Sequence, residues 1–194
     1  MSNKVEIFKN DNPNAHKCIL CAVNNPRGQS IAKDMLRWLK PIYEIHVIWH
    51  DGTKYEYPGI KYLQDLCISI NEPCLYLHTR GAYHFHSNTT MQTHKLWRQE
   101  FGQSRDIYFK LVDTDVPAAA CPFSGKNKHT WYNGFVVNVA AMKAIPEIQP
   151  TEDRMFFERI FRDTEVNICT TKLSNIDDEA GLKLVREYLK KKFR

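Results

Sequence analysis

Three short apolar runs, separated by stretches with helical spacing, constrain the fold of this chain most. Residues 18–23, 45–49 and 74–78 have the length and nearly continuous apolar character of strands buried on both faces. Between them, residues 29–39 and 59–70 repeat apolar side chains at helical spacing. Strand, helix, strand, helix, strand predicts an α/β fold, with a mostly parallel sheet and helices on both of its faces.

The second half of the chain continues this pattern less regularly. We expect a helix over residues 88–102, a strand near 115–121 and a helix over about 136–145. Residues 152–161 predict a further helix, because an N-cap threonine and then two acids precede its apolar positions. At 194 residues the chain fits a single domain.

The two ends of the chain differ from this interior. Residues 1–15 are polar and are expected to form a leader outside the fold. Residues 177–194 predict a C-terminal amphipathic helix, with acids at its start and bases at its end, as the helix macrodipole favours. The side chains expected to pack that helix on the domain are Leu184, Val185, Tyr188 and Leu189.

Hydropathy and charge limit the cellular setting and the partners. No stretch approaches the ~18 consecutive apolar residues of a membrane span, and the start lacks the apolar core of a signal peptide. We therefore expect a cytoplasmic protein without a membrane span. The net charge of +5, much of it in residues 190–194, suits a nucleotide diphosphate, a membrane surface or nucleic acid, and does not choose among them.

Two of the six cysteines, Cys18 and Cys21, have the CxxC spacing of zinc and redox sites. No second CxxC or histidine pair follows at zinc-site spacing. Because the side chains of a strand alternate between its faces, the two sulfurs would point to opposite sides of the sheet. We therefore expect both to be reduced core residues.

Ligands of parallel α/β sheets gather beyond the carboxyl ends of the strands, so segments 24–28, 50–53 and 78–86 should share one edge. In the last of these an arginine can pair bidentately with phosphate, and a glycine permits a sharp turn. Ordinary polar residues ending a strand are the other interpretation. The candidate donor-binding residues are Asn24, Arg27, His78, Thr79, Arg80 and Gly81.

Four segments match, in order and at plausible spacing, the motifs of one enzyme family. They are residues 76–81, 97–98, 115–116 and 129–135. Here the chain resembles GT-A-like glycosyltransferases of microbes and their viruses, whose motifs are of the Tyr-Ile-His-Thr-Lys-Gly, Trp-Arg, Asp-Val-Val-Gly and His-x-x-Gly-Asn-Phe-Trp-Trp types. The resemblance implies a single GT-A-like, Rossmann-related domain that transfers a sugar from a UDP- or GDP-linked nucleotide sugar to a hydroxyl acceptor.

The chain also departs from these motifs. Arg80 stands where the family usually has lysine, which keeps the charge, whereas Pro117 and Ala118 replace a glycine-containing turn. The aromatic segment, 131–136, reads Trp-Tyr-Asn-Gly-Phe-Val rather than Gly-Asn-Phe-Trp-Trp. The resemblance therefore leaves the sugar and the acceptor open.

The resemblance assigns the sugar and acceptor side of the site to residues of that aromatic segment, for which a core aromatic cluster is the other interpretation. These residues are Trp131, Tyr132, Asn133 and Gly134. GT-A folds often carry, at the position of Glu152 and Asp153, the base that deprotonates the acceptor hydroxyl for an inverting attack on the anomeric carbon. Asp153 is the first candidate and Glu152 the second, although the helix dipole alone also favours acids there.

A divalent metal, Mn²⁺ or Mg²⁺, normally holds the nucleotide diphosphate of a GT-A enzyme on an Asp-x-Asp motif. The literal match here is Asp113-Thr114-Asp115, which also reads as a turn between a helix and a strand. In the register of the family, the usual position falls on residues 78–80 instead. The alternative to a metal is a cationic site of His78, Arg80 and Arg27.

The acceptor is a glycan or, as for some viral glycosyltransferases, a modified base in DNA. A DNA acceptor would require phosphate contacts, for which the basic segments 124–128 and 190–194 are the candidates. Two other functional classes stay open, a non-catalytic nucleotide or glycan binder and a nucleotidyltransferase. A nucleotidyltransferase would join the nucleotide to its acceptor, whereas a glycosyltransferase releases free nucleoside diphosphate.

Overall fold

The computed structural model of the chain describes residues 4–53, 56–79, 88–128, 130, 134–151, 156–176 and 178–193. Its elements, in chain order, are β1 (Lys4–Phe8), β2 (Lys17–Val23), α1 (Pro26–Leu39), β3 (Glu44–His50), α2 (Tyr57–Ile70), β4 (Cys74–His78), α3 (Asn88–Trp97), the π-helix η1 (Arg98–Gln103), α4 (Arg105–Val112), β5 (Ala118–Gly125), β6 (Phe135–Val137), α5 (Val139–Ala144), the 3₁₀-helix η3 (Phe156–Arg159), β7 (Asn167–Ile176) and α6 (Asp178–Lys192).

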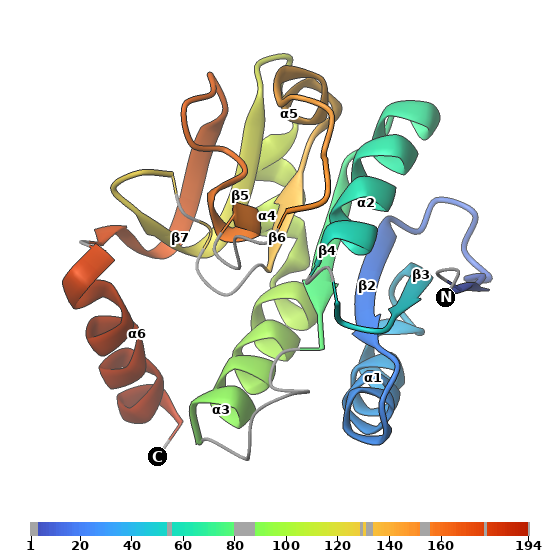
Figure 1. The fold of residues 1–194 in the computed structure, drawn as a ribbon, viewed down its shortest axis with the longest axis horizontal. Coiled ribbons are helices and arrows are strands. Elements are labelled where there is room, and N and C mark those ends of the chain that lie inside the picture. The colour runs from blue at the N-terminus through green and yellow to red at the C-terminus, as the bar shows by residue number, and fades with distance from the viewer. Residues whose placement is uncertain are drawn as a thin grey trace.

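One mixed sheet joins the described strands in the order β1-β3-β2-β4-β6-β5-β7 (Figure 1). The pairs β2–β3, β2–β4 and β5–β7 are parallel, whereas β1 and β6 run antiparallel to their neighbours. Strands β2, β3, β4, β5 and β7 therefore point the same way. We call the edge where these five strands end the carboxyl edge, and the edge where they begin the amino edge.

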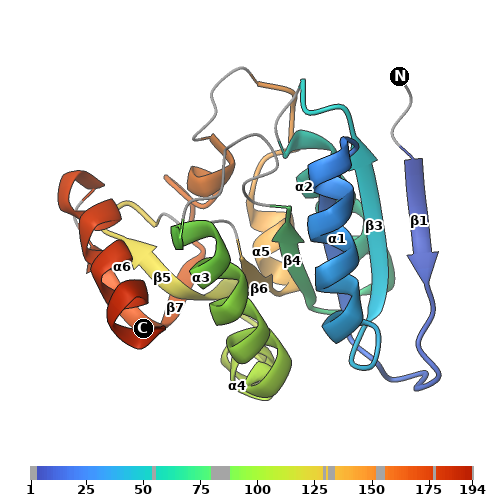
Figure 2. The same cartoon turned by 90° about the horizontal axis from the view of Figure 1, so that it is seen from below.

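Helices cover both faces of the sheet, so the predicted α/β class is confirmed. Helices α1, α3, α4 and α6 pack on one face and α2 and α5 on the other, as Figure 2 shows from below. Strand β2 serves both cores, because its apolar side chains alternate between them. Cys18, Leu20 and Ala22 join the first core, and Ile19 and Cys21 the second.

The two cysteines of the CxxC segment therefore lie on opposite faces of the sheet, as the sequence predicted. Both are buried, and burial raises the pKa of both thiols, that of Cys21 to about 12. A thiol of such high pKa is a poor nucleophile and a poor metal ligand at neutral pH. The core interpretation of this pair is confirmed.

Three features of the first residues of α1 explain why this helix begins at Pro26. Asn25 is the N-cap, and its side chain accepts a hydrogen bond from the backbone N–H of Gly28 at 2.7 Å. Pro26 occupies the first turn, where its missing N–H is not needed. A Cβ on Gly28 would lie 2.1 Å from the carbonyl oxygen of Val23, so only glycine lets the helix start this close to β2.

The expectation of a leader over residues 1–15 was wrong for residues 4–8, which form β1 against β3. This strand is at the edge of the sheet, and its apolar residues Val5 and Ile7 are 41% and 47% exposed. An edge strand of five residues with exposed apolar side chains gives no buried run by which the sequence could reveal it.

The predicted helix over 136–145 was wrong at its start, since β6 occupies 135–137 and α5 only 139–144. Asn138 separates the two, because its side chain caps α5 at the backbone N–H of Ala141. The predicted helix over 152–161 is replaced at its described end by the 3₁₀-helix η3. Residues 152–155 lie outside the described part of the chain.

Strand β5 begins at Ala118 rather than near residue 115, again because of Asn138. Its Nδ2 lies 3.2, 3.0 and 2.9 Å from the carbonyl oxygens of Val112, Thr114 and Val116, and so holds the α4–β5 connection as a turn. Its Oδ1 accepts a hydrogen bond from the backbone N–H of Ala118 at 3.1 Å. This one buried amide organises the amino edge beside β6.

The C-terminal helix is confirmed as α6, with one difference in its packing face. Val185 and Leu189 are buried and Tyr188 is partly buried, but Leu184 is 46% exposed. At the end of the helix, Lys192 Nζ lies 3.7 Å from the buried carboxylate of Glu100 on η1. No described helix is long and apolar enough to cross a membrane.

Candidate functional site

The strand order makes the carboxyl edge beside β2 the place to look for a ligand. The chain leaves β2 for β3 on one side and returns to β4 on the other, so the connections after β2 and β4 diverge there. Ligands of open α/β sheets bind in such a crevice. The residues that follow the three strands at this edge are Asn24, Asp51 and Thr79.

The turn after β2 is held by hydrogen bonds of Asn24 to β3 and to α1. The backbone N–H of Asn24 donates to the carbonyl of His50 at 2.7 Å, and the Asn24 side chain accepts from Gln29 Nε2 at 2.9 Å. Asn24 is exposed at the edge. The turn therefore presents the first residues of α1 in a fixed position.

Arg27, in the first turn of α1, has a buried polar group that no described residue satisfies. Its side chain is half-buried, its Nε is fully buried without a hydrogen-bond partner, and no ion pair links it to a described residue. Buried donors are almost always paired in folded proteins, and a guanidinium stays charged. The dipole of the helix N-terminus also favours an anion at this place.

Thr79, a predicted donor-binding residue, instead joins two strands. It is 3% exposed, its backbone N–H donates to the carbonyl of Cys21 at 2.9 Å, and its hydroxyl accepts from the backbone N–H of Val23 at 3.0 Å. These bonds fix where β2 and β4 end relative to each other. Thr79 therefore positions the neighbours that a ligand would touch.

His78 lies between an acid and an aromatic ring. Its Nδ1 is 3.3 Å from Glu56 Oε1, with both side chains mostly buried, and its ring centroid is 5.6 Å from that of Trp97. Trp97 also stacks on His94 at 5.5 Å and is 1% exposed. The Glu56 carboxylate and the Trp97 ring therefore fix the position of the His78 imidazole at the carboxyl edge.

Gly134, a predicted sugar-binding residue, packs on the same tryptophan. A Cβ at this position would lie 2.4 Å from Trp97 Nε1, so the chain approaches the indole at a distance that only glycine allows. Strand β6 pairs antiparallel with β4, with Tyr76 opposite Phe135. Gly134, which precedes β6, therefore reaches the carboxyl edge beside His78.

The literal Asp-x-Asp does not belong to this edge. Asp113 and Asp115 are exposed and precede β5, at the amino edge, with the length of the strand between them and the carboxyl edge. They do not fit a metal ion that would hold a diphosphate beside β2 and β4. Among the described residues, no group of three or more histidine, cysteine or acidic side chains is gathered for a metal.

Seven predicted site residues lie outside the described part of the chain, and their roles stay predictions. They are Arg80, Gly81, Trp131, Tyr132, Asn133, Glu152 and Asp153.

Sequence reasoning included Gly28 and His50 in segments 24–28 and 50–53 of this edge without giving either a role, and it missed Glu56. His50 is 6% exposed, accepts a hydrogen bond from the backbone N–H of Gly52 at 3.1 Å, and has its pKa lowered to about 4 by burial. The sequence signal for Gly28 was present, because a glycine in the first turn after a strand is typical of close helix–strand packing. Glu56 and His78 are far apart in the chain, and nothing in the sequence pairs them.

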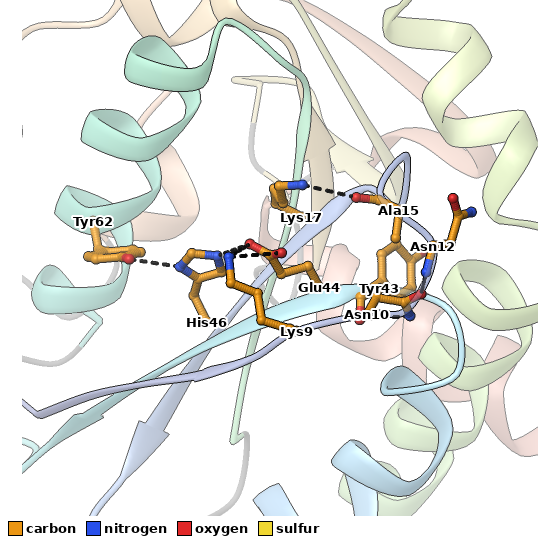
Figure 3. Close-up of polar contacts among 9 residues, drawn as sticks. All are labelled: Lys9, Asn10, Asn12, Ala15, Lys17, Tyr43, Glu44, His46 and Tyr62. Atoms are coloured by element: carbon orange, nitrogen blue, oxygen red, sulfur yellow. Dashed lines mark hydrogen bonds and ion pairs between the residues drawn. The ribbon is translucent and has the colours of Figure 1, made fainter.

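A second polar cluster occupies the amino edge, and its members satisfy one another (Figure 3). His46 Nε2 lies 3.1 Å from Glu44 Oε1 and His46 Nδ1 lies 2.7 Å from the Tyr62 hydroxyl. Lys9 Nζ donates to both carboxylate oxygens of Glu44 at 3.2 Å. Burial lowers the pKa of His46, which keeps the ring neutral between its two partners. This cluster ties β1, β3 and α2 together.

No protein-family model, curated protein or solved structure matches this chain. The case for a function therefore rests on the sequence motifs and on the geometry of the carboxyl edge.

Proposed function

We propose that this protein is a glycosyltransferase that binds a nucleotide-sugar donor at the carboxyl edge beside β2 and β4 and transfers the sugar to a hydroxyl acceptor. The observation that carries the proposal is Arg27, a half-buried cation with an unpaired Nε at the N-terminus of α1. A diphosphate supplies the anionic acceptors that such a group needs.

The arrangement of the matched motifs supports the same interpretation. Segment 76–81 was assigned to the donor and segment 129–135 to the sugar, more than forty residues later in the chain. Their described parts lie on neighbouring strands, β4 and β6, and reach the same edge. A donor whose phosphates lie by α1 would have its sugar directed toward this junction.

Cationic side chains are the proposed partners of the diphosphate. Arg27 and the N-terminus of α1 provide one contact, and His78, held by Glu56, provides a second positive group when protonated. Arg80, the third cation expected from the resemblance, follows His78 by two residues. Asp113 and Asp115 have no part in this proposal because they lie at the other edge of the sheet.

The residues proposed for the chemistry of transfer lie outside the described part of the chain. A base takes the proton of the acceptor hydroxyl, the oxygen attacks the anomeric carbon, and the bond to the nucleoside diphosphate breaks, which inverts the anomeric configuration. Asp153 is the first candidate for that base and Glu152 the second.

The two basic segments considered for a DNA acceptor have different positions. Segment 124–128 comprises the end of β5 and the turn that follows it at the carboxyl edge, with Lys126 exposed and Lys128 bonded to the carbonyl of Thr164. Helix α6 instead follows β7 and runs away from its end, and Lys192 contacts Glu100. Segment 124–128 is therefore the better candidate for acceptor phosphates, whereas a glycan acceptor requires neither segment.

A thermal-shift screen of UDP, GDP, CDP and their sugars, with and without Mn²⁺, tests the proposal, because a ligand that binds only the folded protein raises its Tm. We expect a nucleotide-selective shift in the absence of metal. No shift with any nucleotide would contradict the proposal.

The products then separate the functional classes. Incubation of the shifting sugar nucleotide with oligosaccharide or modified-DNA acceptors should release free nucleoside diphosphate and glycosylate the acceptor. Nucleotide joined to the acceptor would instead indicate a nucleotidyltransferase, and binding without turnover on either acceptor would indicate a binding protein.

A further inference from the structure

A pocket of about 380 Å³ lies on the α2–α5 side of the fold and is lined by none of the residues proposed to bind the donor. Two segments form it, residues 145–148 after α5 and residues 156–164 around η3. The apolar side chains that line it are Ile145, Ile148, Phe156 and Ile160. Its volume lies in the range of small-molecule sites, and apolar lining with a few polar groups is typical of them.

Arg159 is the polar group of this pocket that lacks a partner. The residue is half-buried, its Nε is fully buried without a hydrogen bond, and none of the ion pairs among the described residues includes it. A guanidinium cannot shed its charge in a protein, and leaving its N–H buried and unpaired is costly. The buried side of Arg159 therefore lacks an anion with which its guanidinium could pair.

The two acids that line the pocket do not supply this anion, because each has a cation of its own. Glu147 is 3.5 Å from Lys61 and its side chain is 70% exposed. Asp163 is 3.9 Å from Arg162 and its side chain is 90% exposed. Both carboxylates are thus directed to solvent rather than to the buried side of Arg159.

We propose that this pocket binds a small amphiphilic organic anion, whose carboxylate or phosphate pairs with Arg159 and whose apolar body contacts Ile148, Phe156 and Ile160. The two halves of the ligand follow from the two halves of the lining, since an inorganic anion would leave the apolar wall wet and a neutral hydrocarbon would leave the arginine unpaired. This site shares no residue with the proposed donor site. Its test is therefore independent of the proposed glycosyltransferase activity.

Anilinonaphthalene sulfonate is a suitable probe, because it combines an apolar ring system with an anion and its fluorescence reports binding. We expect the full chain to bind it at one site and Arg159→Gln to weaken that binding by about ten- to a hundredfold, the usual loss for a charge-assisted hydrogen bond. Arg37→Gln, which removes an exposed arginine of α1, should leave binding unchanged. Equal binding by Arg159→Gln and the unaltered protein would overturn the proposal.

A competition experiment on the unaltered protein does not depend on how the variant folds. Hexyl phosphate or hexanoate should displace the probe at concentrations at which hexanol does not, and the more effective of the two anions identifies the preferred headgroup. Displacement by hexanol as effective as by both anions would show an apolar surface without anion selectivity and would overturn the proposal.

Discussion

The two edges of the sheet differ in one buried polar group that the described part of the protein leaves without a partner. At the amino edge, the Asn138 amide bonds to carbonyl and N–H groups of four segments. There, His46 also bonds to Glu44 through one ring nitrogen and to Tyr62 through the other. At the carboxyl edge, Arg27 has a buried Nε without a partner. A polar group whose bonds are complete within the protein stabilises the fold, whereas one left incomplete marks a place for a ligand.

The contrast extends along a single strand. His46 and His50 both belong to β3 and both are buried, but His46 has two side-chain partners and His50 accepts from a backbone N–H at the strand's carboxyl end. Burial lowers the pKa of both rings. The amino edge thus uses its histidine to join three elements, and the carboxyl edge uses one to shape the turn after β3.

Among the variants that test this comparison, Asn138→Ala should have the largest effect on stability. Its amide has two N–H donors shared among three carbonyls, and its oxygen accepts two backbone N–H groups, so removal leaves several buried groups unpaired. We expect a loss of about 2–4 kcal/mol in the free energy of unfolding, measured by urea denaturation. Asn14→Ala, at an exposed turn, is the control, and an equal effect of the two would refute this role of Asn138.

Gly28→Ala should have the next largest effect. It should lower both the stability of the fold and the affinity for a nucleotide. The new Cβ meets the Val23 carbonyl, so α1 must move away from β2, which we expect to cost about 1–3 kcal/mol of stability. Nucleotide binding should also weaken, because Arg27 moves with the helix. Gly102→Ala is a matched control, since its Cβ would have only ordinary contacts with Trp38. Unchanged stability and binding in Gly28→Ala would show that the close approach is not required.

A smaller effect should appear in the pH dependence of stability. The pKa of His50 is about 4 in the folded protein and near 6.5 when unfolded, so below pH 6.5 the unfolded chain binds more protons and stability falls as the pH falls toward 4. His50→Gln, which keeps a hydrogen-bond acceptor for Gly52, should remove about 2 kcal/mol of the loss between about pH 7 and pH 5. The measurement is urea denaturation at both pH values, and an identical loss in both proteins would argue against a buried neutral His50.

The strands at the centre of the sheet were predictable and those at its margins were not. Strands β2, β3 and β4 are buried on both faces, so their apolar runs are continuous and distinctive. Strand β6 has only three residues, too few to be separated by periodicity from the helix that follows. Strand β7 carries polar residues such as Thr170 and Lys172, and it pairs with β5 through register shifts that no local pattern encodes.

The candidate site could be located but not detailed from the sequence. Because parallel strands end at a common edge, the sequence was enough to predict that segments 24–28, 50–53 and 78–86 share this edge. The role of Thr79 as a link to β2, and the contact of Gly134 with Trp97, depend on tertiary contacts between distant segments. Asp113 and Asp115 precede β5, which runs in the same direction as β2 and β4, so they lie at the amino edge and not at the edge proposed for a diphosphate.

The central claim, that Arg27 holds the phosphates of a nucleotide at the carboxyl edge, is tested most directly by calorimetric titration of nucleoside diphosphate into three proteins. These are the unaltered chain, Arg27→Gln and Arg37→Gln, the last an exposed arginine of the same helix that is paired with Asp34. We predict that Arg27→Gln raises the Kd about tenfold or more while Arg37→Gln leaves it unchanged. Equal affinity of Arg27→Gln and the unaltered chain would contradict the account.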